Sequence, residues 1–213
     1  MKTWLLFLLI LSLPSTSWAQ ADTTSWPRKH LLQADIGLTS LPVPRDRGLG
    51  FTINFLYQPW PRSNVSTGFA MTIGQVRSSD SFGYTVAQPT VFLLDLGWIN
   101  QIRLVKANRF AVDASLTSSL LITKLGDWAK PRTVYTRYGR TTEPTYIKTD
   151  AYFALEPGCR LTYHLTPYRS DGVSLFAWAL YRFTYGVGGF STASELTAPV
   201  FITGLMISGY SYR

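Results

Sequence analysis

The chain has 213 residues, with 20 Lys and Arg against 12 Asp and Glu, so its formal net charge is +8. Charged residues make up 15% of the sequence, well below the roughly 25% of an ordinary soluble domain, and aromatic residues reach the same 15%. With a single cysteine, this composition excludes an intramolecular disulfide framework and argues against a disordered chain, a coiled coil and a typical cytosolic enzyme.

The first residues have the layout of an export signal. A short basic start, Met1 to Thr3, precedes an apolar run from Trp4 to Leu13 and a small-residue site that ends at Ala19. The apolar run is too short for a membrane helix, which needs about 20 residues. We therefore expect a signal peptide over 1–19, followed by one domain over 20–213.

The rest of the chain alternates between apolar and polar residues with a period of two, which is typical of half-buried strands. In one clear stretch, Val112 and Ala114 flank Asp113. In the last stretch, the pattern assigns Val200, Ile202 and Met206 to the apolar row. Eight strands are predicted, at 30–38, 48–57, 65–76, 90–103, 109–122, 150–163, 173–185 and 199–212.

The connections between these strands differ in length. The second, fourth and sixth strands are followed by short turns, whereas the other connections are predicted as loops at 39–47, 77–89, 123–149 and 186–198. An even number of antiparallel strands with short turns at one end and longer loops at the other is typical of an outer-membrane barrel.

Two kinds of closed barrel fit such strands. A soluble, lipocalin-like barrel turns its apolar rows inward, whereas a membrane barrel turns them toward lipid. The polar rows consist mainly of Ser, Thr, Gly, Asn and Gln, although a water-facing surface is expected to be densely charged. This favours an all-β fold, an eight-stranded antiparallel up-and-down transmembrane β-barrel.

The few charged residues within the polar rows are expected to pair inside such a barrel. An arginine near the middle of the lipid-facing wall costs about 2–4 kcal/mol, so Arg182 is predicted to point inward. The predicted lumen charge network consists of Asp35, Asp95, Asp113 and Glu156 with Arg160, Arg182 and also Arg103.

Together these features resemble the small outer-membrane barrels of the OmpA, OmpX and PorT-like kind. The resemblance covers the whole chain after the signal peptide, and the closing segment from Gly204 to Tyr212 looks like their terminal strand, although the chain ends on Arg213 instead of an aromatic residue. It implies a Gram-negative cell envelope, insertion by the barrel-assembly machinery and contact with outer-membrane lipid and lipopolysaccharide, but no particular activity.

Catalytic, cofactor and metal sites are not predicted. Some outer-membrane barrels resemble lipid A-modifying enzymes, which use a histidine near the outer leaflet. Here His30 opens the first strand and His164 is predicted in a short turn, both at the opposite end, where neither could reach such a site.

The segment 123–149 is the most distinctive of the predicted loops. It carries six basic residues, interleaved with tyrosines and one tryptophan, against two acidic ones: Lys124, Lys130, Arg132, Arg137, Arg140 and Lys148. Such cations could contact lipopolysaccharide phosphates through charge-assisted hydrogen bonds, and the alternative is an ordinary solvated loop. Export makes nucleic-acid binding a poor interpretation of this pattern.

The sequence thus favours a non-enzymatic outer-membrane barrel with a lumen filled by side chains, acting in envelope structure or through its loops on a surface or protein partner. Two alternatives stay open: a soluble exported barrel that binds an apolar ligand, and an outer-membrane enzyme that modifies lipid.

Overall fold

The structure is a computed structural model that describes residues 29–59, 64–165 and 172–212; at positions 29, 30 and 210–212 only the backbone is described. The predicted signal peptide and the side chain of His30 lie outside this description. Eight strands account for most of the described chain: β1 (Lys29–Val43), β2 (Asp46–Gln58), β3 (Val65–Arg77), β4 (Pro89–Lys106), β5 (Phe110–Thr136), β6 (Gly139–His164), β7 (Gly172–Tyr185) and β8 (Ala198–Tyr212).

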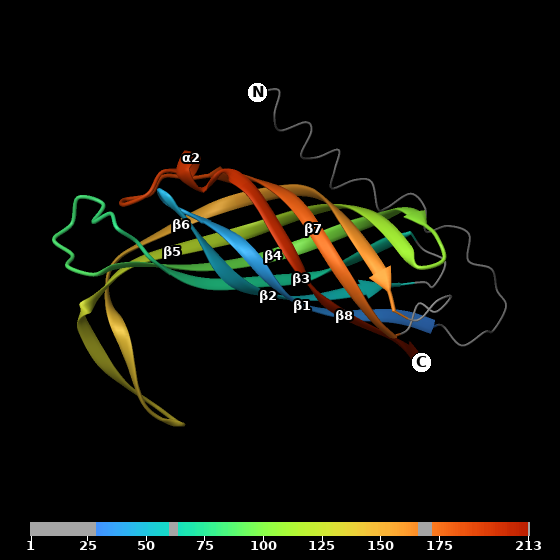
Figure 1. Cartoon of the computed structure of the whole chain (residues 1–213), viewed down its shortest axis with the longest axis horizontal. Helices are drawn as coiled ribbons and strands as arrows, with labels where there is room; N and C mark the ends of the chain where they lie inside the picture. The colour runs from blue at the N-terminus through green and yellow to red at the C-terminus, as the bar shows by residue number, and fades with distance from the viewer. Residues whose placement is uncertain (1–28, 60–63, 166–171, 213) are drawn as a thin grey trace.

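These strands form one closed, antiparallel ring in chain order (Figure 1). The ring closes between the first strand and the last, where Lys29 pairs with Tyr212 and Thr39 with Ile202. Every strand therefore has a neighbour on both sides within the barrel, and no edge stays unpaired there. The predicted eight-stranded up-and-down barrel is confirmed.

The two ends of the barrel differ. One end, here called the arm end, carries the β1–β2 turn, the segments 78–88 and 186–197, and a long β5–β6 hairpin that projects away from the ring (Figure 1). The segment 186–197 contains the short helix α2 (Ala193–Leu196). The other end, here called the terminal end, carries the remaining connections, the start of β1 and the end of β8.

Two predicted loops are strands in the structure. The expected loop 39–47 is continuous pairing of β1 with β2 around a turn at Pro44 and Arg45. The expected loop 123–149 is the outer part of β5 and β6, which run for 27 and 26 residues. We call residues 128–146 of this hairpin the arm.

The arm pairs in spite of its charges and prolines because of how they are placed. Pro131 lies opposite Pro144, and the ladder shifts register near Leu125 and again between Asp127 and Pro131, so these irregularities absorb the missing backbone donors. The remaining residues are mostly threonine, valine and tyrosine, which favour extended pairing.

The orientation of the side chains agrees with a membrane barrel. Large apolar residues such as Phe55 (57% exposed) and Leu120 (48%) lie on the outer wall. The polar rows lie inside, where Asp113 is 4% exposed and Arg182 is 2% exposed. The interior is therefore polar over much of its length and the exterior is apolar.

One predicted face is wrong. Val200, Ile202 and Met206 of β8 point inward, while Phe201, Leu205 and Ile207 are exposed. The run Val200–Ile202 is apolar on both faces, so alternation alone could not fix its phase. The inward residues pack in the lumen with other apolar side chains: Leu56, Ile99, Phe176, Trp178 and Leu180.

No helix among the described residues is long and apolar enough to cross a membrane.

Candidate functional site in the barrel lumen and at the arm end

Arg182 joins two carboxylates in the middle of the lumen. Its Nε donates to Glu156 of β6 and its Nη2 donates to Asp95 of β4, and all three side chains are at least nine-tenths buried. The planar guanidinium suits this arrangement because its donors point to two sides at once. One arginine thus holds three strands together from within.

Arg160 belongs to the second ion-pair group. Its Nη1 donates to Asp35 Oδ2 at 2.7 Å, and both side chains are almost completely buried. The guanidinium lies 4.4 Å from the centre of the Phe176 ring, and its Nη2 lies 3.2 Å from the sulfur of Met206. A cation–π contact and a charge partner together stabilise the charge away from water.

Arg103 and Asp113 form the third ion-pair group, closer to the terminal end. Nε and Nη2 of Arg103 donate to the two carboxylate oxygens at 2.7 and 3.4 Å. The structure therefore gathers all of the predicted lumen residues into three ion-pair groups in one interior.

Between these side chains the lumen contains a small cavity. Its volume is about 20 Å³, counted as space open to the centres of water molecules, which is room for a water molecule or a small ion. The polar residues that line it are Thr52, Asn54, Thr72, Asp95, Thr117 and Glu156.

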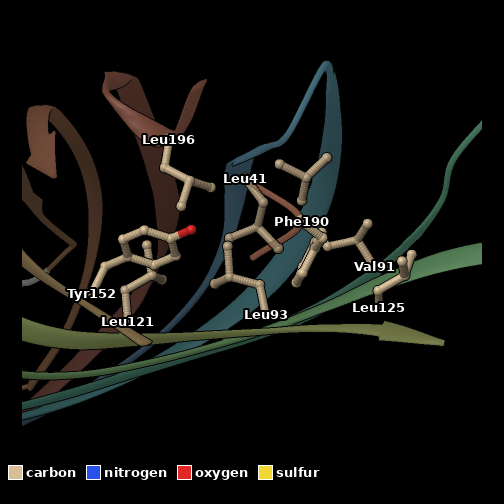
Figure 2. Close-up of a cluster of buried hydrophobic side chains, with 9 residues drawn as sticks. Leu41, Val91, Leu93, Leu121, Leu125, Tyr152, Phe190 and Leu196 are labelled. Atoms are coloured by element: carbon tan, nitrogen blue, oxygen red, sulfur yellow. The ribbon is translucent and has the colours of Figure 1, made fainter. Parts of the chain in front are cut away.

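The arm end of the lumen is closed by an apolar cluster, here called the mouth cluster. Figure 2 shows that its side chains come from β1, β4, β5, β6 and the β7–β8 connection and point toward one another. Phe82, from the β3–β4 connection, packs against the cluster and meets Phe190 edge-to-face, with 5.6 Å between ring centres. Its members are Leu41, Val43, Val91, Leu93, Leu121, Leu125, Tyr152, Phe190 and Leu196.

Asp150 of β6 anchors the β7–β8 connection. Its carboxylate accepts hydrogen bonds from the backbone N–H groups of Gly189 (2.8 Å) and Phe190 (2.9 Å). Tyr152 donates to the carbonyl of Ser191 at 2.7 Å. A side chain at Gly188 would collide with the Tyr152 hydroxyl, since a Cβ there would lie 1.7 Å from it. The connection is thus held tightly over the mouth.

A second fastening on the surface joins three connections. Arg45, in the β1–β2 turn, pairs with Asp80 of the β3–β4 connection and donates to Glu195 of α2 at 3.2 Å. The backbone N–H of Phe82 and then Arg45 hold the pKa of Asp80 below its usual range. Burial acts to raise the pKa of Glu195, but hydrogen bonds from the Thr192 backbone and from Arg45 outweigh it and lower that pKa. Both carboxyls are therefore ionised at neutral pH.

The basic residues of the predicted loop are placed along the hairpin. Lys124 lies on the outer wall of the barrel, at the base of the arm, and is partly exposed. Arg132 pairs with Glu143 at 3.5 Å, and Tyr138 at the tip is 96% exposed. The other basic residues of the set are exposed along the hairpin: Lys130, Arg137, Arg140 and Lys148.

Lys124 lies among aromatic rings. Its Nζ is 5.9 Å from the centre of the Phe92 ring and 5.2 Å from that of Tyr146, and the Arg132 guanidinium is 6.0 Å from Tyr146. Phe92 continues the outward row of Leu94 on β4. Among the described residues, no carboxylate forms an ion pair with Lys124.

His164 is the last residue of β6, buried, and not in a turn as predicted. Its Nδ1 lies 2.9 Å from the hydroxyl of Ser174, which is itself 2% exposed, so a substrate cannot reach the hydroxyl without a rearrangement of the barrel. In the described part of the chain, no group of three or more His, Cys, Asp or Glu side chains is placed to hold a metal ion.

The sequence pattern did not identify Arg45 or Asp150. Arg45 lies in a stretch that was predicted as a loop and Asp150 is the first residue of the predicted sixth strand, and their partners are distant in sequence, as the pairing of Arg45 with Glu195 shows. The Asp-Tyr-rich start of the sixth strand was the available signal, because an acidic residue in an inward row needs donors.

No protein-family model and no curated protein matches this chain. Solved structures with a similar fold include Ail, the attachment invasion locus protein of Yersinia pestis, at 9% identity over 86% of this chain and 100% of that chain, with a TM-score of 0.43. Neisserial surface protein A is 15% identical over 84% and 96%, with a TM-score of 0.47.

The N-terminal β-barrel domain of Pseudomonas aeruginosa OprF is 11% identical over 86% of this chain and all of that domain, with a TM-score of 0.36. At this level the likeness concerns the fold and carries nothing about activity or partners. The strand order of the chain itself establishes the barrel.

Proposed function

We propose that this protein is a non-enzymatic outer-membrane barrel of a Gram-negative envelope, inserted by the barrel-assembly machinery after export. The observation that supports this most strongly is the distribution of side chains around a closed ring. Phe55, Leu120 and Phe201 face outward and are about half exposed, while Arg160 and Arg182 are paired inside. Such a surface is stable in lipid and unfavourable in water.

The soluble alternative requires the opposite arrangement. A lipocalin-like barrel would place its apolar rows around a ligand cavity, but the lumen contains three ion-pair groups and a cavity of only about 20 Å³. The enzymatic alternative requires reactive groups near the outer leaflet, whereas the buried His164–Ser174 pair lies toward the terminal end. Envelope structure and surface contact therefore suit the molecule better.

The cations of the arm and its base indicate which chemical groups the protein surface would contact. Lys124 lies where the apolar outer wall ends and the charged hairpin begins, which in an outer membrane corresponds to the depth of phosphorylated headgroups. Its position beside Phe92 and Tyr146 shields the ammonium from water without neutralising it. We infer that Lys124 and Arg132 contact lipopolysaccharide phosphates, with the cations farther along the arm adding attraction.

Fractionation tests the location. The protein should sediment with outer membranes, and it should migrate differently in gel electrophoresis before and after boiling, because a closed barrel resists detergent until heated. Recovery in the soluble periplasmic fraction would contradict the proposal.

Binding of lipid phosphate is tested in nanodiscs that contain lipid A with or without its phosphates. The variant Lys124→Gln/Arg132→Gln should lose most of the preference for the phosphorylated form. Lys106→Gln, which removes an exposed cation at the terminal end, is the matched control and should keep it. Equal binding by both variants would assign the arm to solvent or to a protein partner instead.

A further inference from the structure

The charges in the lumen do not balance. Its three ion-pair groups contain four carboxylates and three arginines. Arg103 with Asp113 and Arg160 with Asp35 are each balanced one to one, so the surplus negative charge lies where Arg182 meets both Asp95 and Glu156. The other residues that line the adjoining cavity are uncharged.

The same cavity contains polar atoms without a partner. Asp95 Oδ1, Thr117 Oγ1 and Asn54 Nδ2 are buried and make no hydrogen bond to protein, and all three residues line the cavity. Each of these residues is at most 5% exposed. Buried polar atoms in proteins are almost always paired, so these three indicate an occupant.

A water molecule alone accounts for only part of this. It would fit the cavity and offer hydrogen bonds to its lining, but it would leave one net negative charge inside a barrel wall of low dielectric constant. Removing a charge from water without a counter-charge costs far more than leaving a hydrogen bond unmade. The occupant must therefore also bring one positive charge.

We propose that the cavity beside Arg182 is a binding site for a monovalent cation, which supplies one positive charge as an alkali ion or as a proton on the Asp95–Glu156 pair. Carboxylate and hydroxyl oxygens are the donors that hard cations prefer, and Asp95 with Thr117 provides both. If a proton supplies the charge, the protonated carboxyl becomes a donor and a water molecule in the cavity accepts from it. Both forms neutralise the same surplus.

The test uses the folded chain in detergent micelles and does not depend on where the protein resides in the cell. The unfolding midpoint is measured in sodium chloride and in choline chloride at equal ionic strength, because choline is too large for the cavity. The infrared band of a protonated carboxylic acid is recorded at neutral pH. The wild-type protein should show either a higher midpoint in sodium or the carboxylic-acid band.

Glu156→Gln removes the surplus charge and keeps a carbonyl oxygen for Arg182. This variant and Asp95→Asn should lose both signals, and their midpoint in choline should equal or exceed that of the wild type. Asp113→Asn, taken from a balanced pair, is the control and should keep the wild-type signal.

Three results would overturn the proposal. One is a wild-type barrel with neither signal, and another is persistence of a signal in both neutralised variants. The third applies to a wild type that shows the sodium signal without the carboxylic-acid band: a Glu156→Gln barrel that then unfolds more easily than the wild type in choline, since neutralising an uncompensated charge should not weaken the fold.

Discussion

At the scale of single residues, the lumen depends on arginine. Arg160 and Arg182 each combine a planar face and several fixed donors, which lets one side chain contact a carboxylate on one strand and a ring or a second carboxylate on another. Lysine in the same place would keep the charge but would lack the planar set of donors that reaches two partners at once. The strands are therefore joined across the lumen as well as along their edges.

We expect Arg160→Leu to destabilise the barrel by about 3–5 kcal/mol, because it leaves the carboxylate of Asp35 buried without a partner. Urea unfolding followed by the gel-mobility shift measures the change. Adding Asp35→Asn should recover much of the loss, since no buried charge then remains.

The exposed pair Arg132–Glu143 is the control for this measurement. Arg132→Gln should change stability by about 0–1 kcal/mol, because both partners are already in contact with solvent. Equal losses from Arg160→Leu and Arg132→Gln would mean that burial of the lumen pair contributes little.

At the scale of elements, the arm end combines a rigid closure with a free projection. The connections 78–88 and 186–197 are fixed over the mouth by Phe82, Phe190 and the surface pairs of Arg45. The arm extends beyond the ring and shares no ladder with β4 or β7 past Asp127 and Phe153. The closure should therefore respond to pH, and the arm should be separable from the fold.

The pKa of Asp80 is lowered in the folded protein, first by the Phe82 backbone N–H and then by Arg45. A carboxyl with a lowered folded pKa contributes stability above its unfolded pKa and loses it as the pH falls through the folded pKa. We expect the closure to persist at neutral and mildly acidic pH and to loosen only below the usual carboxyl range.

An NMR titration of the Asp80 carboxyl carbon measures this directly. In Arg45→Gln the midpoint should rise part of the way toward the usual carboxyl value, because the Phe82 N–H remains as a donor. An unchanged midpoint would show that the pair between Arg45 and Asp80 has no energetic role.

Replacing most of the arm, residues 130–145, by a short Asn-Gly turn should leave the barrel intact. The ring is closed by pairs below this segment, such as Leu96 with Leu120 and Leu120 with Phe153. The shortened protein should keep its heat-dependent gel mobility and lose part of its preference for phosphorylated lipid, because Arg132 is removed while Lys124 remains. Failure to form the heat-resistant band would show that the arm is needed for folding.

At the scale of the whole molecule, the barrel exposes large apolar side chains on its outer wall and buries charged ones beside two apolar clusters in its interior. Its apolar side chains form a belt on the outside, and its charges meet inside. The belt is what lipid would cover, so the energetic cost of a charged substitution there should depend on its height along the strand.

Leu116→Arg, on the outer wall of β5, should cost about 2–4 kcal/mol of folding free energy in lipid vesicles. Thr133→Arg, on the exposed part of the same strand, should cost close to nothing. Folding into vesicles, measured by the fraction of heat-resistant band against urea concentration, gives both values. Similar costs at the two positions would contradict a lipid-covered belt.

The inward direction of Arg182 was predicted from the cost of an arginine on the lipid-facing wall. Alternation along the chain was sufficient to predict the ring, because a period of two determines a face wherever one row is polar. It was insufficient at Val200–Ile202, where both rows are apolar and only packing against Trp178 and Leu180 selects the face. At these positions the alternation leaves the inward face undetermined, and only the packing in the folded barrel determines it.

The arm end was harder to predict for a related reason. The basic residues of 123–149 resemble a loop in composition, yet cross-strand partners such as Thr133 with Thr142 pair them as strands. The contacts of Arg45 and Asp150 join segments far apart in sequence, and no local spacing reports such pairs. The surplus negative charge in the lumen could be recognised only after the structure had shown which residues form ion pairs and which line the cavity.

The antiparallel seam between β1 and β8 places the two ends of the ring side by side, with Lys29 opposite Tyr212. The closed ring therefore does not depend on which strand comes first in the chain. A circularly permuted gene, with a linker across this seam and new chain ends within residues 107–109, should encode a protein that folds into the same eight-stranded barrel. If it does, strand order serves export and assembly and not the final architecture.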